Sequence, residues 1–156
     1  MPANDGGTAQ DGDEALRLLS LVERTLTARL EEALRGRGSS LDQWRILRLL
    51  AARGGCPMNV VAEHVLLLAP KLSKLVDRMV SANLVLRRRD VSDRRRVLIV
   101  VSARGRRALA DWDEATADVR AQFRELLGAD ADQFEGLLRR LQDGLDPASV
   151  EQASLT

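Results

Sequence analysis

The sequence predicts a mainly α-helical protein with one small β-hairpin near its centre. Apolar residues recur every three or four positions over most of the 156 residues, which is the spacing of one buried helix face. The exception is residues 84–101, where two short runs of strand-forming residues flank an arginine-rich stretch. Because 45% of the residues are hydrophobic, a chain of this length can bury a sizeable core. We therefore expect one helical domain, or one and a half.

Three helices are predicted before the central stretch. The first covers residues 13–35, carries an apolar stripe about six turns long and ends at two glycines. The second covers residues 41–53, follows the two candidate caps Ser39 and Ser40 and stops at another pair of glycines. A short third helix covers residues 58–65. Before them, the acidic, Gly-rich residues 1–12 are expected to form a disordered tail.

The central stretch is predicted to hold a fourth helix and the hairpin. This helix opens at Pro70, which a first helical turn tolerates, and ends near Asn83, which tolerates a left-handed cap. Residues 84–86 begin the first strand, and residues 97–101 form the second. The basic loop 87–96 joins the two strands. A short helix, a tight turn and a second helix with a polar N-terminal half form a helix-turn-helix pattern. With the following hairpin, the pattern is that of a winged helix-turn-helix.

Two further helices are predicted after the hairpin, at residues 103–127 and 130–145, with Gly128 between them. Residues 146–156, which begin around Pro147, are expected to fray. Long helices thus flank the winged unit on both sides.

Positive charge is concentrated between Lys71 and Arg107. This segment holds twelve basic and three acidic residues, which gives it a net charge of +9. The whole chain carries only +1, so the remainder must sum to −8. A surface of this kind is what binding to a polyanion requires.

The residue inventory excludes several other classes of protein. One His and one Cys leave no metal site of the usual composition, and no phosphate-binding, dinucleotide or nucleophile motif is present. We therefore expect no enzyme activity, no metal and no cofactor. Cys56 cannot form an intrachain disulfide, which favours a reducing, cytoplasmic setting, and no apolar run is long enough to span a membrane. Aromatic residues are too few for stacking on single strands.

The wing stretch DVSDRRRVLIVVSARGR resembles that of the MarR family of transcriptional regulators, in which a D-x-R loop precedes a strand and a Thr/Ser-x-x-Gly-Arg helix start. The matching positions here are Asp93, Arg95, Ser102, Gly105 and Arg106. LSKLVDRMVSANLV is similar to the family's recognition helix and LDQWRILRLL to its second helix, so that the resemblance covers about residues 16–145. Two departures are Asn83, where the family usually has Gly, and the turn at residues 66–68, which lacks Gly.

The resemblance implies a homodimer formed through residues 13–38 and 103–145, with the winged units, residues 39–102, side by side on a pseudo-palindromic double-stranded operator. It further implies a repressor that a small, often anionic aromatic inducer releases from DNA, bound between the dimerisation region and the winged unit. A second hypothesis is a helical interaction or architectural module whose basic hairpin meets an acidic partner.

In the recognition helix we predict that Lys71 and Lys74 contact bases and that Arg78 contacts phosphate. Pro70 and Ser73 lie beside them on the exposed side of the helix. The alternative is an ordinary solvated helix face.

In the wing we predict that Arg95, and after it Arg94, enters the minor groove, whose negative potential suits arginine. Asp93 is expected to pair with an arginine and hold the shape of the hairpin. Residues 87–89 would neutralise phosphates, with one of them packing inward by its stem. The alternative is a solvated edge. The predicted wing contacts are Arg88, Arg94, Arg95 and Arg96.

A ligand pocket is predicted at Trp44 and Arg45, since an arginine can receive a carboxylate through two hydrogen bonds. The alternative is that Trp44 belongs to the core and Arg45 is merely exposed. His64 could titrate near neutral pH and Cys56 could sense oxidants, but a surface or packing role is the alternative for both.

Overall fold

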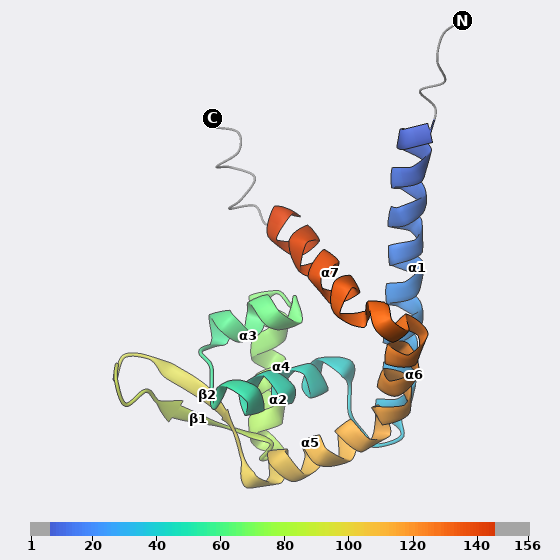
Figure 1. Ribbon diagram of the computed structural model, residues 1–156. Helices are drawn as coiled ribbons and strands as arrows, with labels where there is room; N and C mark the ends of the chain where they lie inside the picture. The colour runs from blue at the N-terminus through green and yellow to red at the C-terminus, as the bar shows by residue number, and fades with distance from the viewer. Residues whose placement is uncertain (1–6, 146–156) are drawn as a thin grey trace, which may run out of the picture. The chain divides into compact units, whose positions relative to one another are not determined.

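The computed structural model describes residues 7–145, with side chains from Gly12 onward, and its fold is mainly helical with one β-hairpin, as predicted (Figure 1). The elements are α1 (Gly7–Arg35), α2 (Leu41–Arg53), α3 (Met58–Val65), α4 (Ala69–Ser81), β1 (Val85–Arg89), β2 (Val97–Val101), α5 (Ala103–Ala115), α6 (Ala117–Leu127), a 3-10 turn (Gly128–Asp130) and α7 (Ala131–Leu145). They divide into an N-terminal unit that reaches Ala117 and a C-terminal unit that begins at Asp118.

The start and end of α2 are set by local sequence. The Ser40 hydroxyl accepts a hydrogen bond from the Gln43 N–H at 3.3 Å, and the Gln43 side chain accepts one from the Ser40 N–H at 3.1 Å. This reciprocal capping box satisfies two N–H groups that the first turn would leave unpaired. At the other end Gly54 takes φ +74°, a left-handed conformation that glycine adopts without strain.

The core of the N-terminal unit lies among α2, α3, α4, the hairpin and α5. Each helix contributes one apolar stripe, so the helix-turn-helix and the wing share a single hydrophobic cluster. The side chains with the least exposure in this cluster are Leu34, Ile46, Leu47, Leu50, Val61, Leu72, Val76, Met79, Val85 and Ile99.

The hairpin is antiparallel, with Val85 opposite Val101 and Arg89 opposite Val97. A third piece of chain joins its edge, because Cys56 exchanges two backbone hydrogen bonds with Ile99, at 3.0 and 2.8 Å. The sequence predicts no strand at Cys56. A single residue has no alternation for a sequence pattern to detect.

Two predicted helix boundaries are corrected. The first helix begins at Gly7 rather than at residue 13 and continues through Gly12, although glycine disfavours a helix interior. The predicted helix 103–127 is two helices, because Thr116 interrupts it. The buried Thr116 hydroxyl donates to the Trp112 carbonyl at 2.9 Å, and such bonding to the preceding turn bends helices. Of the two predicted tails, residues 1–6 and 146–156 lie outside the described residues.

Two residues other than glycine take a left-handed backbone, each at a helix end. Asn83, with φ +56°, ends α4 as predicted from its tolerance of this conformation. Leu66, also with φ +56°, ends α3, although its Cβ makes that conformation unfavourable. The turn that lacks glycine is therefore built at the expense of backbone strain at Leu66.

Replacement of Leu66 by glycine should raise the free energy of unfolding by about 1 kcal/mol, because the strain disappears and an 87% exposed side chain loses little packing. Urea unfolding followed by tryptophan fluorescence measures this. The control is Ala82→Gly, where φ is −80°, which should lower stability by about 0.5–1 kcal/mol. If both glycines destabilise equally, the strain assigned to Leu66 is absent.

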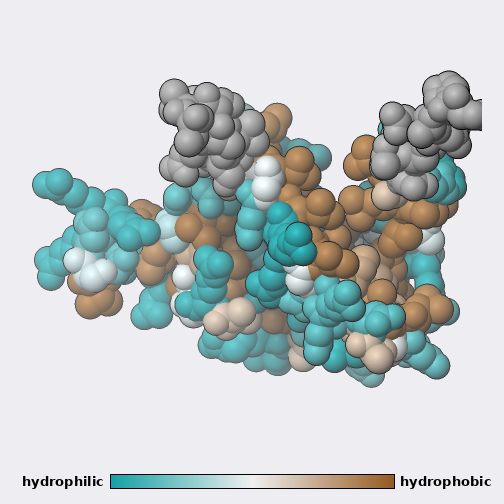
Figure 2. Space-filling view, turned by 45° about the horizontal axis from the view of Figure 1, so that its top comes forward, coloured by the Kyte–Doolittle hydropathy of each residue, from teal (hydrophilic) through white to brown (hydrophobic). Residues whose placement is uncertain are grey.

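The C-terminal unit consists of α6, the 3-10 turn and α7. Its internal contact is an edge-to-face pair between Phe123 and Phe134, with ring centroids 6.1 Å apart. No residue of α7 is buried, and its leucines form an exposed stripe: Leu137, Leu138, Leu141 and Leu145. A similar exposed set on α1 consists of Leu16, Leu18, Leu19, Leu21 and Val22. Apolar surface of this kind is visible in brown in Figure 2.

No helix within residues 7–145 combines the length and the apolar content that crossing a membrane requires.

Candidate nucleic-acid interface

The helix α4 separates cleanly into a buried and an exposed face. Leu72, Leu75, Val76 and Met79 are buried, and the C-terminal residue Ser81 is exposed. All five predicted contact residues of this helix lie together on the exposed side: Pro70, Lys71, Ser73, Lys74 and Arg78. Pro70 stands in the first turn, where its missing N–H has no cost. The arrangement presents two lysines, a hydroxyl and a guanidinium to one side of the helix.

An ion pair joins α4 to the hairpin. The Arg87 guanidinium bonds to the Asp77 carboxylate at 2.5 Å, and both side chains are substantially exposed. An exposed pair of this kind contributes little stability. Its main effect on the surface is to offset the one negative charge on α4, so that the field of Lys71, Lys74 and Arg78 is not weakened.

Alternation along β1 sends its arginines to opposite faces of the hairpin. Arg87 lies on the face of the buried residues Val85 and Ile99, which is also the side of α4. Arg89 shares that face. All three arginines of the group 87–89 are nevertheless exposed, so the inward packing of one of them stays a prediction.

Arg88 lies on the other face of β1, away from α4. There it lines a pocket of about 300 Å³ between the end of α2, the strands and the start of α5, with Arg106 and Ser102. Arg88 therefore faces away from the cationic side of α4. Strand register determines this, and the run of three arginines in the sequence does not reveal it.

Two aspartates shape the tip of the wing. The Asp93 carboxylate accepts the Arg95 N–H at 3.0 Å, and the Asp93 carbonyl accepts the Arg96 N–H at 2.9 Å. Asp93 thus holds the turn, as predicted, but through backbone N–H groups instead of the predicted arginine side chain. Asp90, which the sequence analysis left without a role, accepts both the N–H and the hydroxyl of Ser92, and these bonds lower the pKa of the Asp90 carboxyl.

The tip arginines are exposed and face solvent. Arg94, Arg95 and Arg96 make no side-chain ion pair with any residue in the described part of the chain. Val91 beside them is 99% exposed. Asp93 is bonded to backbone N–H groups and Asp90 to the N–H and hydroxyl of Ser92. The three guanidinium groups at the tip therefore remain available to an external anion.

The junction between the wing and α5 is tightly packed. The Ser102 hydroxyl caps α5 by accepting the Gly105 N–H at 2.8 Å, and the Ser102 N–H donates to the Leu84 carbonyl at 3.0 Å. A Cβ added to Gly105 would lie 2.0 Å from that same carbonyl oxygen. Ser102 and Gly105 therefore fix the base of the wing and are not contact residues.

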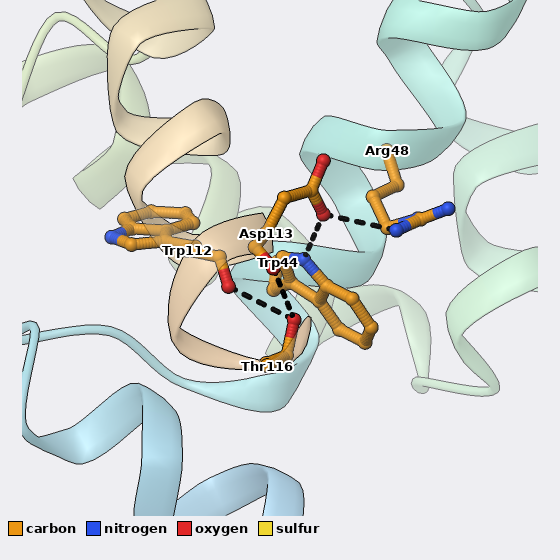
Figure 3. A network of polar contacts seen from close by, with 5 residues as sticks. All are labelled: Trp44, Arg48, Trp112, Asp113 and Thr116. Atoms are coloured by element: carbon orange, nitrogen blue, oxygen red, sulfur yellow. Dashed lines mark hydrogen bonds and ion pairs between the residues drawn. The ribbon is translucent and has the colours of Figure 1, made fainter. Parts of the chain in front are cut away.

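The predicted ligand residue Trp44 belongs to the core, with 6% of its surface exposed. Its indole N–H donates to the Asp113 carboxylate at 2.9 Å, and Arg48 donates to the same oxygen at 2.9 Å (Figure 3). The Arg48 guanidinium also lies 5.1 Å from the centroid of the Trp44 ring. This network joins α2 to α5 and already uses the polar atom of Trp44. Arg45 is half-buried beside it.

His64 and Cys56 have shifted pKa values with plain physical causes. Partial burial, and then the charges of Arg53 and Arg45, lower the pKa of His64, which favours its neutral imidazole. Burial raises the pKa of the Cys56 thiol, with Arg53 opposing, which makes a reactive thiolate scarce. Within residues 7–145 no three His, Cys, Asp or Glu side chains are grouped so as to hold a metal ion.

Comparison with known proteins gives consistent matches. The MarR family model matches residues 40–97. The chain is 31% identical over 87 residues to the HTH-type transcriptional regulator FarR of Neisseria gonorrhoeae, covering 56% of this chain and 60% of FarR. It is 33% identical over 86 residues to the homoprotocatechuate degradative operon repressor of Escherichia coli, covering 53% of this chain and 58% of the repressor. The chain thus matches about 60% of the length of these curated relatives.

The structural likeness extends further along the chain. The crystal structure of NadR in complex with 4-hydroxyphenylacetate superimposes with a TM-score of 0.72 and 26% identity, covering 90% of this chain and 97% of NadR. The matched residues 40–97 contain α2, α3, α4, β1 and the tip of the wing, and end at the first residue of β2. The chain is therefore similar to the MarR family, in sequence over residues 40–97 and in its winged helix-turn-helix fold over most of its length.

Proposed function

We propose that this protein is a homodimeric transcriptional regulator that binds a specific double-stranded DNA sequence and acts as a repressor. The proposal is carried by two cationic features of the same unit. One is the exposed face of α4, and the other is the set of three guanidinium groups at the wing tip that form no ion pair within the described residues. The first suits base edges in the major groove and the second suits the adjacent minor groove.

The proposed contacts follow from this geometry. Lys71 and Lys74 would donate to base edges, Ser73 and Pro70 would lie against the groove, and Arg78 would bind phosphate. At the wing, Arg95 would enter the minor groove, with Arg94 and Arg96 beside it. Arg88, which faces away from α4, should contribute only through its charge.

The exposed leucines support the homodimer. A helix with an apolar stripe and no buried residue, such as α7, needs a partner surface. In a two-fold dimer, the same stripe of a second copy supplies one. Two winged units would then meet half-sites about one helical turn apart.

The names of the relatives support a small aromatic acid as the inducer. NadR was crystallised with 4-hydroxyphenylacetate, and the Escherichia coli relative is named for homoprotocatechuate degradation. Arg45, half-buried next to Trp44, is the proposed carboxylate partner. Titration of 4-hydroxyphenylacetate into the protein–DNA complex should release the DNA, whereas an equal concentration of 4-hydroxyphenylethanol, which lacks the carboxylate, should not.

The function is tested by a salt titration of binding to the duplex upstream of the protein's own gene and to a scrambled duplex of equal length, read by fluorescence anisotropy. Specific binding should be about a thousandfold tighter than binding to the scrambled duplex. The alternative is a module that binds polyanions independently of sequence. It would be favoured if binding to both duplexes, and to duplexes enriched from a random library, is equally weak and equally sensitive to salt.

The wing assignment is tested by Arg95→Ala. This variant should bind the operator about 1–3 kcal/mol more weakly, because one guanidinium is lost from the minor groove. Arg124→Ala, an equal charge change on α6, is the matched control and should keep operator affinity. Unchanged affinity in the Arg95 variant would remove the wing from the interface.

A further inference from the structure

The turn between α3 and α4 exposes apolar side chains next to the cationic face. Leu66 is 87% exposed and Leu68 is 81% exposed, whereas Leu67 between them packs against the core. Ala69 and Pro70, the first two residues of α4, are exposed as well. We call Leu66, Leu68, Ala69 and Pro70 the apolar turn.

Both exposed leucines stand where the local backbone favours another residue type. Leu66 has a positive φ, which suits glycine or asparagine. Leu68 is the N-cap of α4 and offers no side-chain hydrogen bond, whereas α2 and α5 in the same unit are capped by Ser40 and Ser102. Residues that contradict local preference at two neighbouring positions indicate a requirement other than stability.

The surroundings indicate the chemistry of what covers this turn. From Leu66 to Lys74 the chain contains two lysines and no acidic residue, and both lysines are exposed. An apolar patch bordered by cations complements a polyanion that carries apolar groups. In the major groove of DNA, the 5-methyl group of thymine is the apolar group presented on the base edges.

We propose that Leu68, with Pro70 beside it, packs against thymine 5-methyl groups and makes the protein prefer thymine at the matching operator position. Leu68 immediately precedes the first turn of α4, so that its side chain flanks the lysines that face the bases. This inference rests on the proposed DNA-binding function and adds an apolar contact to a surface otherwise described by charge.

The experiment removes the methyl group and the leucine separately. A duplex is enriched from a random library with the full-length protein, and each thymine of one half-site is replaced in turn by deoxyuridine, which pairs identically but lacks the methyl group. Affinities are measured for the wild type, for Leu68→Ala and for Val91→Ala. The last variant shortens another exposed apolar side chain, on the wing tip.

For at least one thymine, the wild type should lose about fourfold in affinity with deoxyuridine, the value of one buried methyl group. In Leu68→Ala the same replacement should have almost no effect, and the slope of affinity against salt should stay unchanged, since no phosphate contact is lost. Val91→Ala should keep the fourfold methyl effect, whatever its overall affinity.

The inference and the function on which it rests fail in different ways. Specific binding without any methyl effect in the wild type, or with an undiminished methyl effect in Leu68→Ala, would overturn the thymine contact and leave the DNA-binding function standing. If no duplex is enriched over random sequence, the proposed function fails and the thymine contact with it.

Discussion

The double variant Leu137→Glu/Leu141→Glu is expected to be monomeric and to lose specific DNA binding. Both leucines belong to the exposed stripe of α7 and are 46% and 52% exposed in the single chain. A two-fold dimer contains two copies of each substitution, so four leucines would be replaced by glutamates. Each replacement should remove about 2 kcal/mol of hydrophobic free energy from dimerisation. Dimer dissociation should therefore increase at least about a thousandfold, as measured by analytical ultracentrifugation. Operator binding should fall toward the level of non-specific binding.

The control Arg140→Glu makes the same change in net charge, −2, on the same helix but outside the leucine stripe. It should remain dimeric. If the double glutamate variant is also dimeric and binds the operator with wild-type affinity, the dimer is formed by another surface. A wild-type protein that is itself monomeric at micromolar concentration would refute the dimer altogether.

The elements of the N-terminal unit were predictable where local chemistry determines them. Ser40 and Gly54 delimit α2 through a capping box and a left-handed glycine, and Asn83 ends α4 in the conformation that asparagine tolerates. The apolar stripe of α4 has the helical period, so its exposed face could be named residue by residue. These signals act within four residues of one another, which is the range over which a sequence pattern is informative.

The features that were missed depend on contacts between distant residues. Cys56 pairs with Ile99 across more than forty residues, and nothing near Cys56 signals it. Thr116 interrupts a helix whose apolar period continues on both sides, because its hydroxyl bonds to the Trp112 carbonyl. The period of the apolar residues predicts a helix. It does not show where a side-chain hydroxyl bonds to a backbone carbonyl and interrupts that helix.

The candidate site divides in the same way. The exposed face of α4 follows from periodicity, and the turn-forming role of Asp93 follows from its residue type. The separation of Arg87 from Arg88 requires the register of β1 with β2. The use of the Trp44 indole by Asp113, 69 residues away, requires the packing of α2 on α5. The sequence leaves Trp44 open between a ligand pocket and the core, and only this packing shows that it lies in the core with its indole N–H bonded.

Gly105→Ala is expected to be the most destabilising single methyl addition in the N-terminal unit. The new Cβ would meet the Leu84 carbonyl oxygen at 2.0 Å and the Val101 side chain at 2.9 Å. The carbonyl cannot retreat freely, because it accepts the Ser102 N–H at the base of the wing. We expect a loss of about 3 kcal/mol in the free energy of unfolding, from overpacking and a weakened buried hydrogen bond. Both tryptophans lie in this unit, so their fluorescence during urea unfolding reports on it.

The matched control is Gly36→Ala, in the same unit, where an added Cβ would lie 3.7 Å from its nearest neighbour. This substitution should change stability by no more than about 0.5 kcal/mol. A Gly105 variant as stable as this control would show that α5 can move away from the hairpin without loss. The close approach at Gly105 would then not be what fixes the wing relative to α4, and the wing would have to be held by its other contacts, among them the backbone hydrogen bonds between Cys56 and Ile99 and the packing of Val85 and Ile99 in the core.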